Sequence, residues 1–240
     1  MLEDPSIGLS RICRTNGVPL EDHHLQQLRR YVALLLDWNS RVNLISRRDE
    51  ENVWWSHILH SLSILFFLQP PAGMRVVDIG TGGGLPGIPL AILRNDLRFV
   101  LLDSIRKKTA AVQNIVDQLV LPNVRVETGR AEEIGNQNDM ACAFDIVVAR
   151  AVAPLEDLVR WSKRLMRGTA GAGIPHRMAT PDGRPLRSPL LVALKGGDLS
   201  EEVRRAQEKV RNAVISSNIL AFPGSDELGL EDKRLVTVEF

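Results

Sequence analysis

The stretch Asp78–Gly87, which reads DIGTGGGLPG, decides the fold. It overlaps the end of a short apolar run, Arg75–Ile79, that is typical of a buried strand, and it leads into a helix-like segment, Pro86–Leu93. Glycines allow the backbone to approach a ligand and to adopt positive φ angles. Asp103 ends the next apolar run, where an acid can accept hydrogen bonds from two ribose hydroxyls. The stretch therefore predicts a site for a nucleoside-containing cofactor.

Two cofactors fit this pattern, a nicotinamide dinucleotide and S-adenosylmethionine. In a dinucleotide fingerprint the glycines follow the strand at once, and the pyrophosphate lies on the helix N-terminus. Here Asp78 lies inside the strand end, in a D-x-G-x-G-x-G spacing, and a carboxylate suits the cationic groups of S-adenosylmethionine better than a pyrophosphate. The pattern favours methyl transfer, with Asp78, Gly82 and Asp103 as cofactor-binding residues. A turn that only joins strand to helix is not favoured, because five glycines fall within the eight residues Gly80–Gly87.

Strand-like apolar runs alternate with helical segments after residue 74. The predicted strands are Arg75–Ile79, Arg98–Asp103, Val124–Glu127, Phe144–Val148, Leu190–Leu194, Ala213–Leu220 and Arg234–Phe240. The predicted helices are Pro86–Leu93, Lys107–Leu119, Leu155–Met166 and Glu201–Asn212. Such alternation predicts a parallel sheet covered on both faces. The last two strands lack a helix between them, which predicts an antiparallel pair at one edge. The predicted fold class is α/β: a doubly wound, mostly parallel seven-stranded sheet of the Rossmann-like, class I S-adenosylmethionine-dependent methyltransferase type.

The segment before this core is predicted to be helical. Asp22–Trp38 and Asp49–Leu68 carry apolar residues at three-to-four spacing, with Asp49 as the N-cap of the second helix. We therefore divide the chain into an N-terminal helical extension, residues 1–73, and a methyltransferase core, residues 74–240, and expect them to pack as one body. Residues 168–188 are rich in glycine and proline and show no apolar periodicity, which favours a mobile insertion over a binding lid.

The composition excludes several classes of protein. With 240 residues, of which 44% are hydrophobic, the chain can build a sizeable core. Thirty basic and 29 acidic residues give a net charge of +1, so any contact with nucleic acid must be local. Cys13 and Cys142 cannot make a disulfide framework, no signal peptide is visible, and the apolar stretch Leu62–Leu68 is too short to span a bilayer. We expect a soluble, cytoplasmic protein.

The residues after the fourth predicted strand narrow the methyl acceptor. Enzymes that methylate amino nitrogens of bases usually carry [N/D]-P-P-[Y/F] there, whereas Ala149–Pro154 reads ARAVAP. Enzymes that methylate a base carbon of the cytosine type need a nucleophilic cysteine, and Cys142 precedes the strand, at the end away from the ligand. Neither acceptor is favoured.

Several motifs together resemble one known family. They are Asp37–Ser46 (DWNSRVNLIS), His57–Leu59 with Ser61–Leu62, Asp78–Pro89, Leu102–Ser104 with Lys107–Lys108, Gly129–Glu133, Phe144–Pro154 and Leu194–Gly196. On these motifs the sequence resembles the RsmG family, also called glucose-inhibited division protein B, over most of residues 25–240. It departs from the family at His60, where the H-x-L-D-S pattern has Asp, and at the insertion 168–188, which affects the RNA-facing rim.

The resemblance implies N7 methylation of a guanine in 16S ribosomal RNA, with S-adenosylmethionine as the donor. The partner would be 16S rRNA or a small-subunit ribosomal particle, and we expect a monomer. It also implies a cofactor site that includes Gly80, Leu85, Ala131, Glu132 and Arg150. Ala131 and Glu132 follow the third predicted strand, where a backbone N–H and a carboxylate could read the adenine edge. Alternatively, the acids there only favour a helix N-terminus.

The implied chemistry needs few catalytic groups. Guanine N7 has an available lone pair, so catalysis reduces to in-line placement against the methyl group and exclusion of water. Arg150, just past the fourth strand, is the candidate catalytic residue. It is predicted to contact guanine O6, a phosphate or the cofactor carboxylate, because an N7 that accepts from arginine cannot attack. A salt bridge to a neighbouring acid is the alternative. No metal is expected, since His57 and His60 lack a third ligand.

Local contact with RNA is predicted for a set of basic residues: Arg41, Arg47, Arg48, Arg106, Lys107, Lys108 and Lys195. Each alone is more readily a solvated surface charge, but as a cluster they fit phosphate contacts. Two other functions stay open. One is an NAD(P)-dependent oxidoreductase, and the other is a non-catalytic RNA- or ribosome-binding protein that retains the cofactor pocket.

Overall fold

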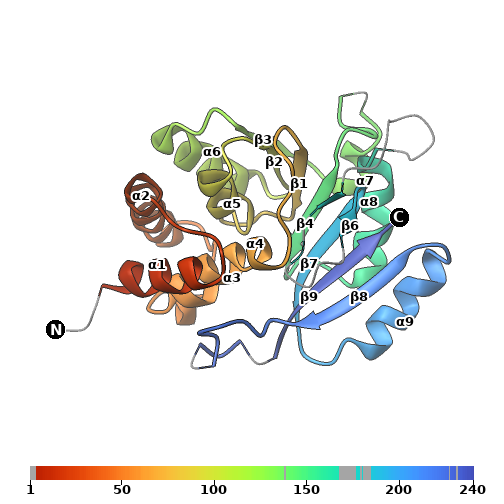
Figure 1. Ribbon diagram of the computed structural model, residues 1–240. Coiled ribbons are helices and arrows are strands. Elements are labelled where there is room, and N and C mark those ends of the chain that lie inside the picture. The colour runs from red at the N-terminus through yellow and green to blue at the C-terminus, as the bar shows by residue number, and fades with distance from the viewer. Residues whose placement is uncertain are drawn as a thin grey trace.

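A central sheet organises the molecule (Figure 1). The computed structural model describes residues 4–137, 139–167, 177–178, 180, 185–226, 228–230 and 232–240. Within these residues seven strands form one sheet in the order β3-β2-β1-β4-β7-β9-β8. They are β1 (Arg75–Ile79), β2 (Arg98–Asp103), β3 (Val124–Thr128), β4 (Ile146–Arg150), β7 (Leu190–Gly196), β8 (Val214–Ile219) and β9 (Lys233–Glu239). Neighbours pair in parallel except at β9, which runs antiparallel to both β7 and β8. The predicted fold class is confirmed.

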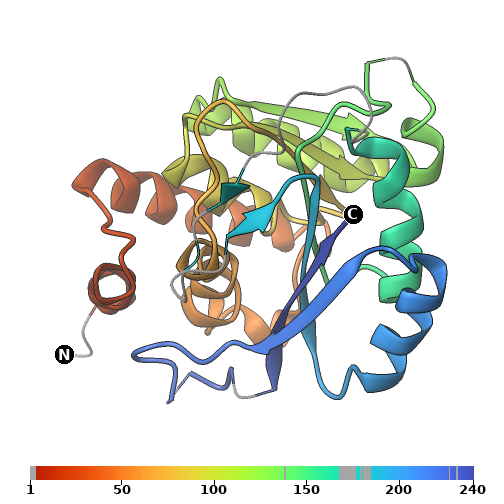
Figure 2. The ribbon, with the colours of Figure 1, turned by 45° about the vertical axis from the view of Figure 1, so that its right-hand side comes forward.

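Helices cover both faces of this sheet. They are α1 (Pro5–Thr15), α2 (Asp22–Asn39), α3 (His60–Leu62), α4 (Ile64–Phe67), α5 (Gly87–Leu93), α6 (Arg106–Leu119), α7 (Ala131–Ile134), α8 (Leu155–Leu165) and α9 (Ser200–Lys209). Helices α1 to α6 lie on one face, and α7, α8 and α9 on the other (Figures 1 and 2). Successive strand residues point to opposite faces. Val76 therefore joins the buried cluster beneath α5 and α6, and Val77 the cluster beneath α8.

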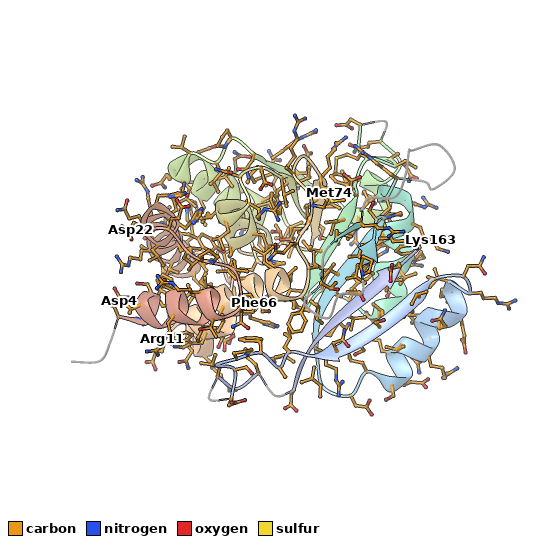
Figure 3. All side chains as sticks on the ribbon, in the orientation of Figure 1. Asp4, Arg11, Asp22, Phe66, Met74 and Lys163 are labelled. Atoms are coloured by element: carbon orange, nitrogen blue, oxygen red, sulfur yellow. The ribbon has the colours of Figure 1, made fainter. Side chains whose placement is uncertain are left out.

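The N-terminal helices and the sheet share one of these buried clusters. Leu28 and Tyr31 of α2 and Leu62 of α3 are fully buried in the same cluster as Ile88 and Leu101 of the core. Figure 3 labels interior residues, Phe66 and Met74, and outward-pointing residues, Asp4, Arg11, Asp22 and Lys163. The extension is thus packed against the core as part of one hydrophobic interior.

The predicted helical run Asp49–Leu68 is confirmed for most of residues 53–67, but its start and its internal geometry differ. It consists of a π-helical turn, η2 (Trp54–Leu59), followed directly by the short α3 and α4, and a separate 3-10 turn, η1 (Arg47–Asp49), precedes it. Asp49 is not an N-cap; it is the last residue of η1. Within the run, Ser61 donates to the His57 carbonyl at 2.7 Å and Ser63 to the His60 carbonyl at 2.8 Å. Such bonds compete with the regular helix ladder.

Most of the predicted mobile insertion lies outside the described residues. Of residues 168–188, the described ones include two short antiparallel strands, β5 (Arg177–Met178) and β6 (Leu186–Arg187), and Met178 is fully buried. In the described part of the chain, no helix is long and apolar enough to cross a membrane.

Candidate active site

Asp78 anchors the glycine loop by hydrogen bonds. It is the second-last residue of β1, and its side chain is fully buried. Its Oδ2 accepts hydrogen bonds from the Thr81 hydroxyl at 2.7 Å and from the Gly87 N–H at 2.9 Å. Burial raises the pKa of Asp78 to about 7, although these two bonds act to lower it. Asp78 thus ties the first residues of the loop to the start of α5, and it does not line either of the cavities described below.

Two glycines of the loop are required by close packing. Gly80 has a φ of +67°, and a Cβ there would lie 2.6 Å from the Val152 methyl groups. A Cβ on Gly83 would lie 2.7 Å from the Leu35 side chain, and the Tyr31 hydroxyl donates to the Gly83 carbonyl at 2.9 Å. The loop is therefore clamped between α2 and the segment after β4.

Asp103 lies across from the loop at the end of β2. Its Oδ2 accepts from the Gly82 N–H at 3.0 Å and its Oδ1 from the Ile105 N–H at 2.9 Å. A carboxylate has about four acceptor positions, so both oxygens keep lone pairs for further donors. Gly82 acts on the site through this bond, which orients the carboxylate.

A cavity of about 270 Å³, called here the loop cavity, opens beside these residues. Its walls come from the C-terminal ends of β1, β2 and β4, from the start of α7, and from α6 and α8. They are Ile79, Gly80, Leu102, Asp103, Ser104, Ile105, Lys108, Gly129, Arg130, Ala131, Glu132, Ala151, Val152 and Trp161. The loop cavity brings together four predicted cofactor residues: Gly80, Asp103, Ala131 and Glu132. Leu85 is buried in the core and does not line it.

Several residues that line the loop cavity were not among the predicted site residues. Ser104 and Ile105 directly follow β2, and Val152 follows β4, so their position after a strand could have identified them. Trp161 reaches the cavity from within α8, and no local signal marks it. Lys108, predicted to contact RNA, lines this cavity instead of standing apart on the surface.

A second, wider cavity of about 650 Å³, called here the strand-end cavity, lies next to the first. It is lined by Asp49, Ser56, His57, His60, Arg150, Ala151, Val152, Ala153, Leu194, Lys195, Gly196, Glu202, Leu228, Gly229, Leu230 and Lys233. The two cavities share Ala151 and Val152 as a common wall. A ligand in each would therefore approach the other across this two-residue segment.

Arg150 belongs to the strand-end cavity and not to the loop cavity. Its Nη1 donates to the Ser56 carbonyl at 3.0 Å, and its Nη2 lies 2.6 Å from His57 Nδ1. Among the described residues, no carboxylate forms an ion pair with it, so the alternative of a salt bridge is not what the structure contains. Arg150 instead joins the end of β4 to the π-helical turn of the N-terminal extension.

Six of the seven predicted RNA-binding residues fall into two groups, and the seventh, Lys108, lines the loop cavity. Arg41 pairs with Asp37 and lies over the Trp38 ring at 4.3 Å, while Lys195 pairs with Glu202 and donates to the Ala153 carbonyl at 2.8 Å. The other group is exposed and makes no side-chain ion pair within the described residues: Arg47, Arg48, Arg106 and Lys107. This second group can meet a phosphate without breaking an existing ion pair.

Comparison with known proteins identifies the family. Residues 24–172 match the family described as GidB, rRNA small subunit methyltransferase G. The chain belongs to this family. It is 40% identical over 198 residues to ribosomal RNA small subunit methyltransferase G of Chlorobaculum tepidum, which covers 82% of this chain and 80% of that protein. It is 39% identical over 219 residues to the protein of the same name from Bacteroides fragilis, covering 91% and 94%.

Solved structures support the fold. A variant of MtNAS in complex with S-adenosylmethionine has a TM-score of 0.52 and 15% identity, covering 90% of this chain and 76% of that one. The Methanococcus jannaschii fibrillarin pre-rRNA processing protein has a TM-score of 0.51 and 9% identity, covering 74% and 73%. At these identities the likeness concerns the fold alone.

The GidB match extends over most of the site. Residues 24–172 include most of α2, the turn with His57, the glycine loop, Asp103 and Arg150. Most of the N-terminal extension is therefore part of the GidB family unit and not an appendage to it. The predicted family is confirmed.

Proposed function

We propose that this protein transfers the methyl group of S-adenosylmethionine to N7 of a guanine in 16S ribosomal RNA. The observation that carries the proposal is the pair of adjoining cavities, with Ala151 and Val152 as their common wall. The smaller cavity would hold the methyl donor and the wider one the acceptor base. Membership of the GidB family supports an rRNA methyltransferase over the oxidoreductase and over a non-catalytic binding protein.

The residues of the loop cavity fit the donor. Asp103 keeps lone pairs for two ribose hydroxyls while two backbone N–H groups hold its carboxylate in place. Ala131 and Glu132 begin α7 and can meet an adenine through a backbone N–H and a carboxylate. The absence of a side chain at Gly80 lets the chain approach the donor closely, beside Val152. The donor supplies a methyl group on a sulfonium, which is already a good leaving group.

The protein's own contribution to the reaction is placement. N7 of guanine carries a lone pair, so no residue has to remove a proton before attack. The common wall sets the approach of the base to the methyl group, and the buried surroundings exclude water. Arg150 orients the turn that carries His57 instead of touching N7, which leaves the N7 lone pair free.

The decisive experiment compares the 16S rRNA of cells with and without this protein. Mass mapping of nucleosides is expected to find one 7-methylguanosine that disappears on deletion and returns when purified protein and S-adenosylmethionine act on small-subunit particles from the deletion strain. Unchanged 7-methylguanosine after deletion would overturn the proposal. The D103A variant is the matched control, since it should lose affinity for S-adenosylmethionine in calorimetry.

A further inference from the structure

Two buried histidines line the strand-end cavity. His57 lies in the π-helical turn η2 and His60 begins α3, and each is only 6% exposed. Both side chains border the cavity in which the acceptor base is proposed to lie. Single π-helical turns within helices occur frequently at functional sites. The position of the proton on each ring decides what these side chains can bind.

The proton on the His57 ring can be assigned from its partner. Its Nδ1 lies 2.6 Å from Arg150 Nη2, and a guanidinium can only donate, so Nδ1 is the acceptor. Burial, with the positive charge of Arg150, lowers the pKa of His57 to about 3. The ring is therefore neutral near pH 7 and carries its proton on Nε2. This Nε2 is buried and has no hydrogen-bond partner; the nearest acid, Asp49, lies 3.6 Å away.

His60 carries the opposite arrangement. The Ser56 backbone acts to raise the pKa of the His60 ring, and its Nε2 has no partner. A proton on Nδ1, facing the Ser56 carbonyl, leaves a lone pair on Nε2. Burial, together with Arg150, Lys233 and His57, lowers the pKa of His60 to about 3, so this ring is neutral as well. The Ser56 carbonyl accepts from Arg150 and has a second lone pair for a further donor.

Unpartnered buried polar atoms are rare in proteins, and each requires an explanation. Six side-chain atoms of this kind occur among the described residues, and two of them are the Nε2 atoms of His57 and His60. With the His60 proton on Nδ1, one is a donor and the other an acceptor, three residues apart on one helical turn at the wall of a cavity of ligand-binding size. This arrangement matches a ligand that presents an acceptor next to a donor.

We propose that His57 and His60 recognise the Watson–Crick edge of the acceptor guanine. His57 Nε2–H donates to O6, and His60 Nε2 accepts from N1–H. Adenine presents the reverse order, an amino donor at position 6 and an acceptor at N1, so it would meet donor against donor and acceptor against acceptor. Recognition on this edge leaves N7 free to attack. Single-stranded RNA bases are commonly read in this way. The inference rests on the proposed function.

Imidazole NMR tests the recognition without turnover. In the full-length chain labelled with ¹⁵N-histidine, His57 is expected as the Nε2–H form and His60 as the Nδ1–H form at pH 7. Guanosine 5′-monophosphate at millimolar concentration should shift both Nε2 resonances, and adenosine 5′-monophosphate, which carries the same phosphate, should not. Identical tautomers of the two rings, or equal shifts with both nucleotides, would overturn the inference.

Substitution at His60 gives the kinetic test. H60L removes the acceptor, and H60Q keeps an oxygen acceptor near the position of Nε2. We expect H60L to lower kcat/KM for methylation of small-subunit particles about tenfold, and H60Q to recover most of it, while affinity for S-adenosylmethionine changes less than about twofold in both. Wild-type kcat/KM in a folded H60L would refute the role of His60. Absence of methylation by the wild-type protein would instead refute the proposed function. The NMR comparison would still show whether His57 and His60 distinguish guanine from adenine.

Discussion

Asp78 supports the cofactor site through the backbone, and its burial gives a pH-dependent signature. A carboxyl whose pKa is raised to about 7 in the folded state binds its proton more tightly there than in the unfolded chain. It therefore favours folding at low pH, and this contribution is lost as pH rises from about 4 to about 7. D78N keeps an oxygen acceptor but cannot titrate. Relative to D78N, we expect the wild-type free energy of unfolding to fall by about 3 kcal/mol over that range, measured by urea titration.

The comparison with D78N is needed because His57 and His60 act in the opposite direction. Their pKa values are lowered on folding, so their contribution is lost as pH falls below about 6. Both proteins contain these histidines, so the difference between the two pH profiles isolates Asp78. Parallel profiles would show that Asp78 has an ordinary pKa in the folded protein.

Arg150 is predicted here to anchor the π-helical turn and not to bind the cofactor. R150A would remove two charge-assisted hydrogen bonds and leave the Ser56 carbonyl with one fewer donor. We expect a loss of about 2 kcal/mol in the free energy of unfolding and lower methylation, with the Kd for S-adenosylmethionine changed less than about twofold in calorimetry. R160A, which removes an exposed arginine paired with Asp157, is the control and should cost less than about 0.5 kcal/mol. A large rise in that Kd for R150A would restore a cofactor-binding role.

At the level of elements, the strands were predictable and the turn with the histidines was not. β1 and β2 have the predicted bounds, because continuous apolar runs ending in glycine or acid are a local signal. The segment between Asp49 and Leu68 has a helical apolar stripe and is helical from residue 53, yet it forms a π-helical turn where the Ser56 carbonyl accepts from Arg150. That bond joins residues 94 positions apart, so no local pattern records it. Trp161 likewise reaches the loop cavity only through the packing of α8 in the folded chain, so no local pattern predicts it.

The contact between Gly80 and Val152 is predicted to couple the stabilities of the loops after β1 and β4. G80A would place a methyl group 2.6 Å from the Val152 side chain, at a φ of +67° that L residues rarely adopt. We expect a loss of about 3 kcal/mol in the free energy of unfolding, together with weaker binding of S-adenosylmethionine. Adding V152A should recover part of the loss, since it removes the two methyl groups at 2.6 Å but leaves the Cβ at 3.1 Å and the backbone strain. A double-mutant cycle from urea unfolding measures this coupling, and strict additivity would contradict it.

For the whole molecule, the near balance of 30 basic and 29 acidic residues is compatible with separate sites of opposite sign. Asp78, Asp103 and Glu132 lie in or beneath the loop cavity, where a cationic donor would bind. Arg41 and Lys195 are already neutralised by their own acids. Of the seven predicted RNA-binding residues, the exposed group of Arg47, Arg48, Arg106 and Lys107 therefore remains available to an RNA phosphate.

This division predicts a salt-dependent loss of RNA binding when the exposed cations are removed. Arg47 and Arg48 lie in the same 3-10 turn as Asp49, which lines the strand-end cavity. Replacing both with alanine should weaken binding to 16S rRNA fragments and reduce the slope of log K against log salt by about 1.5, because two phosphate contacts to single-stranded RNA are lost. The matched control replaces Arg11 and Arg14 of α1 with alanine. This double variant changes the net charge by the same amount, and neither residue lines either cavity. Equal salt slopes for the two double variants would show that overall charge, and not this rim, governs the encounter with RNA.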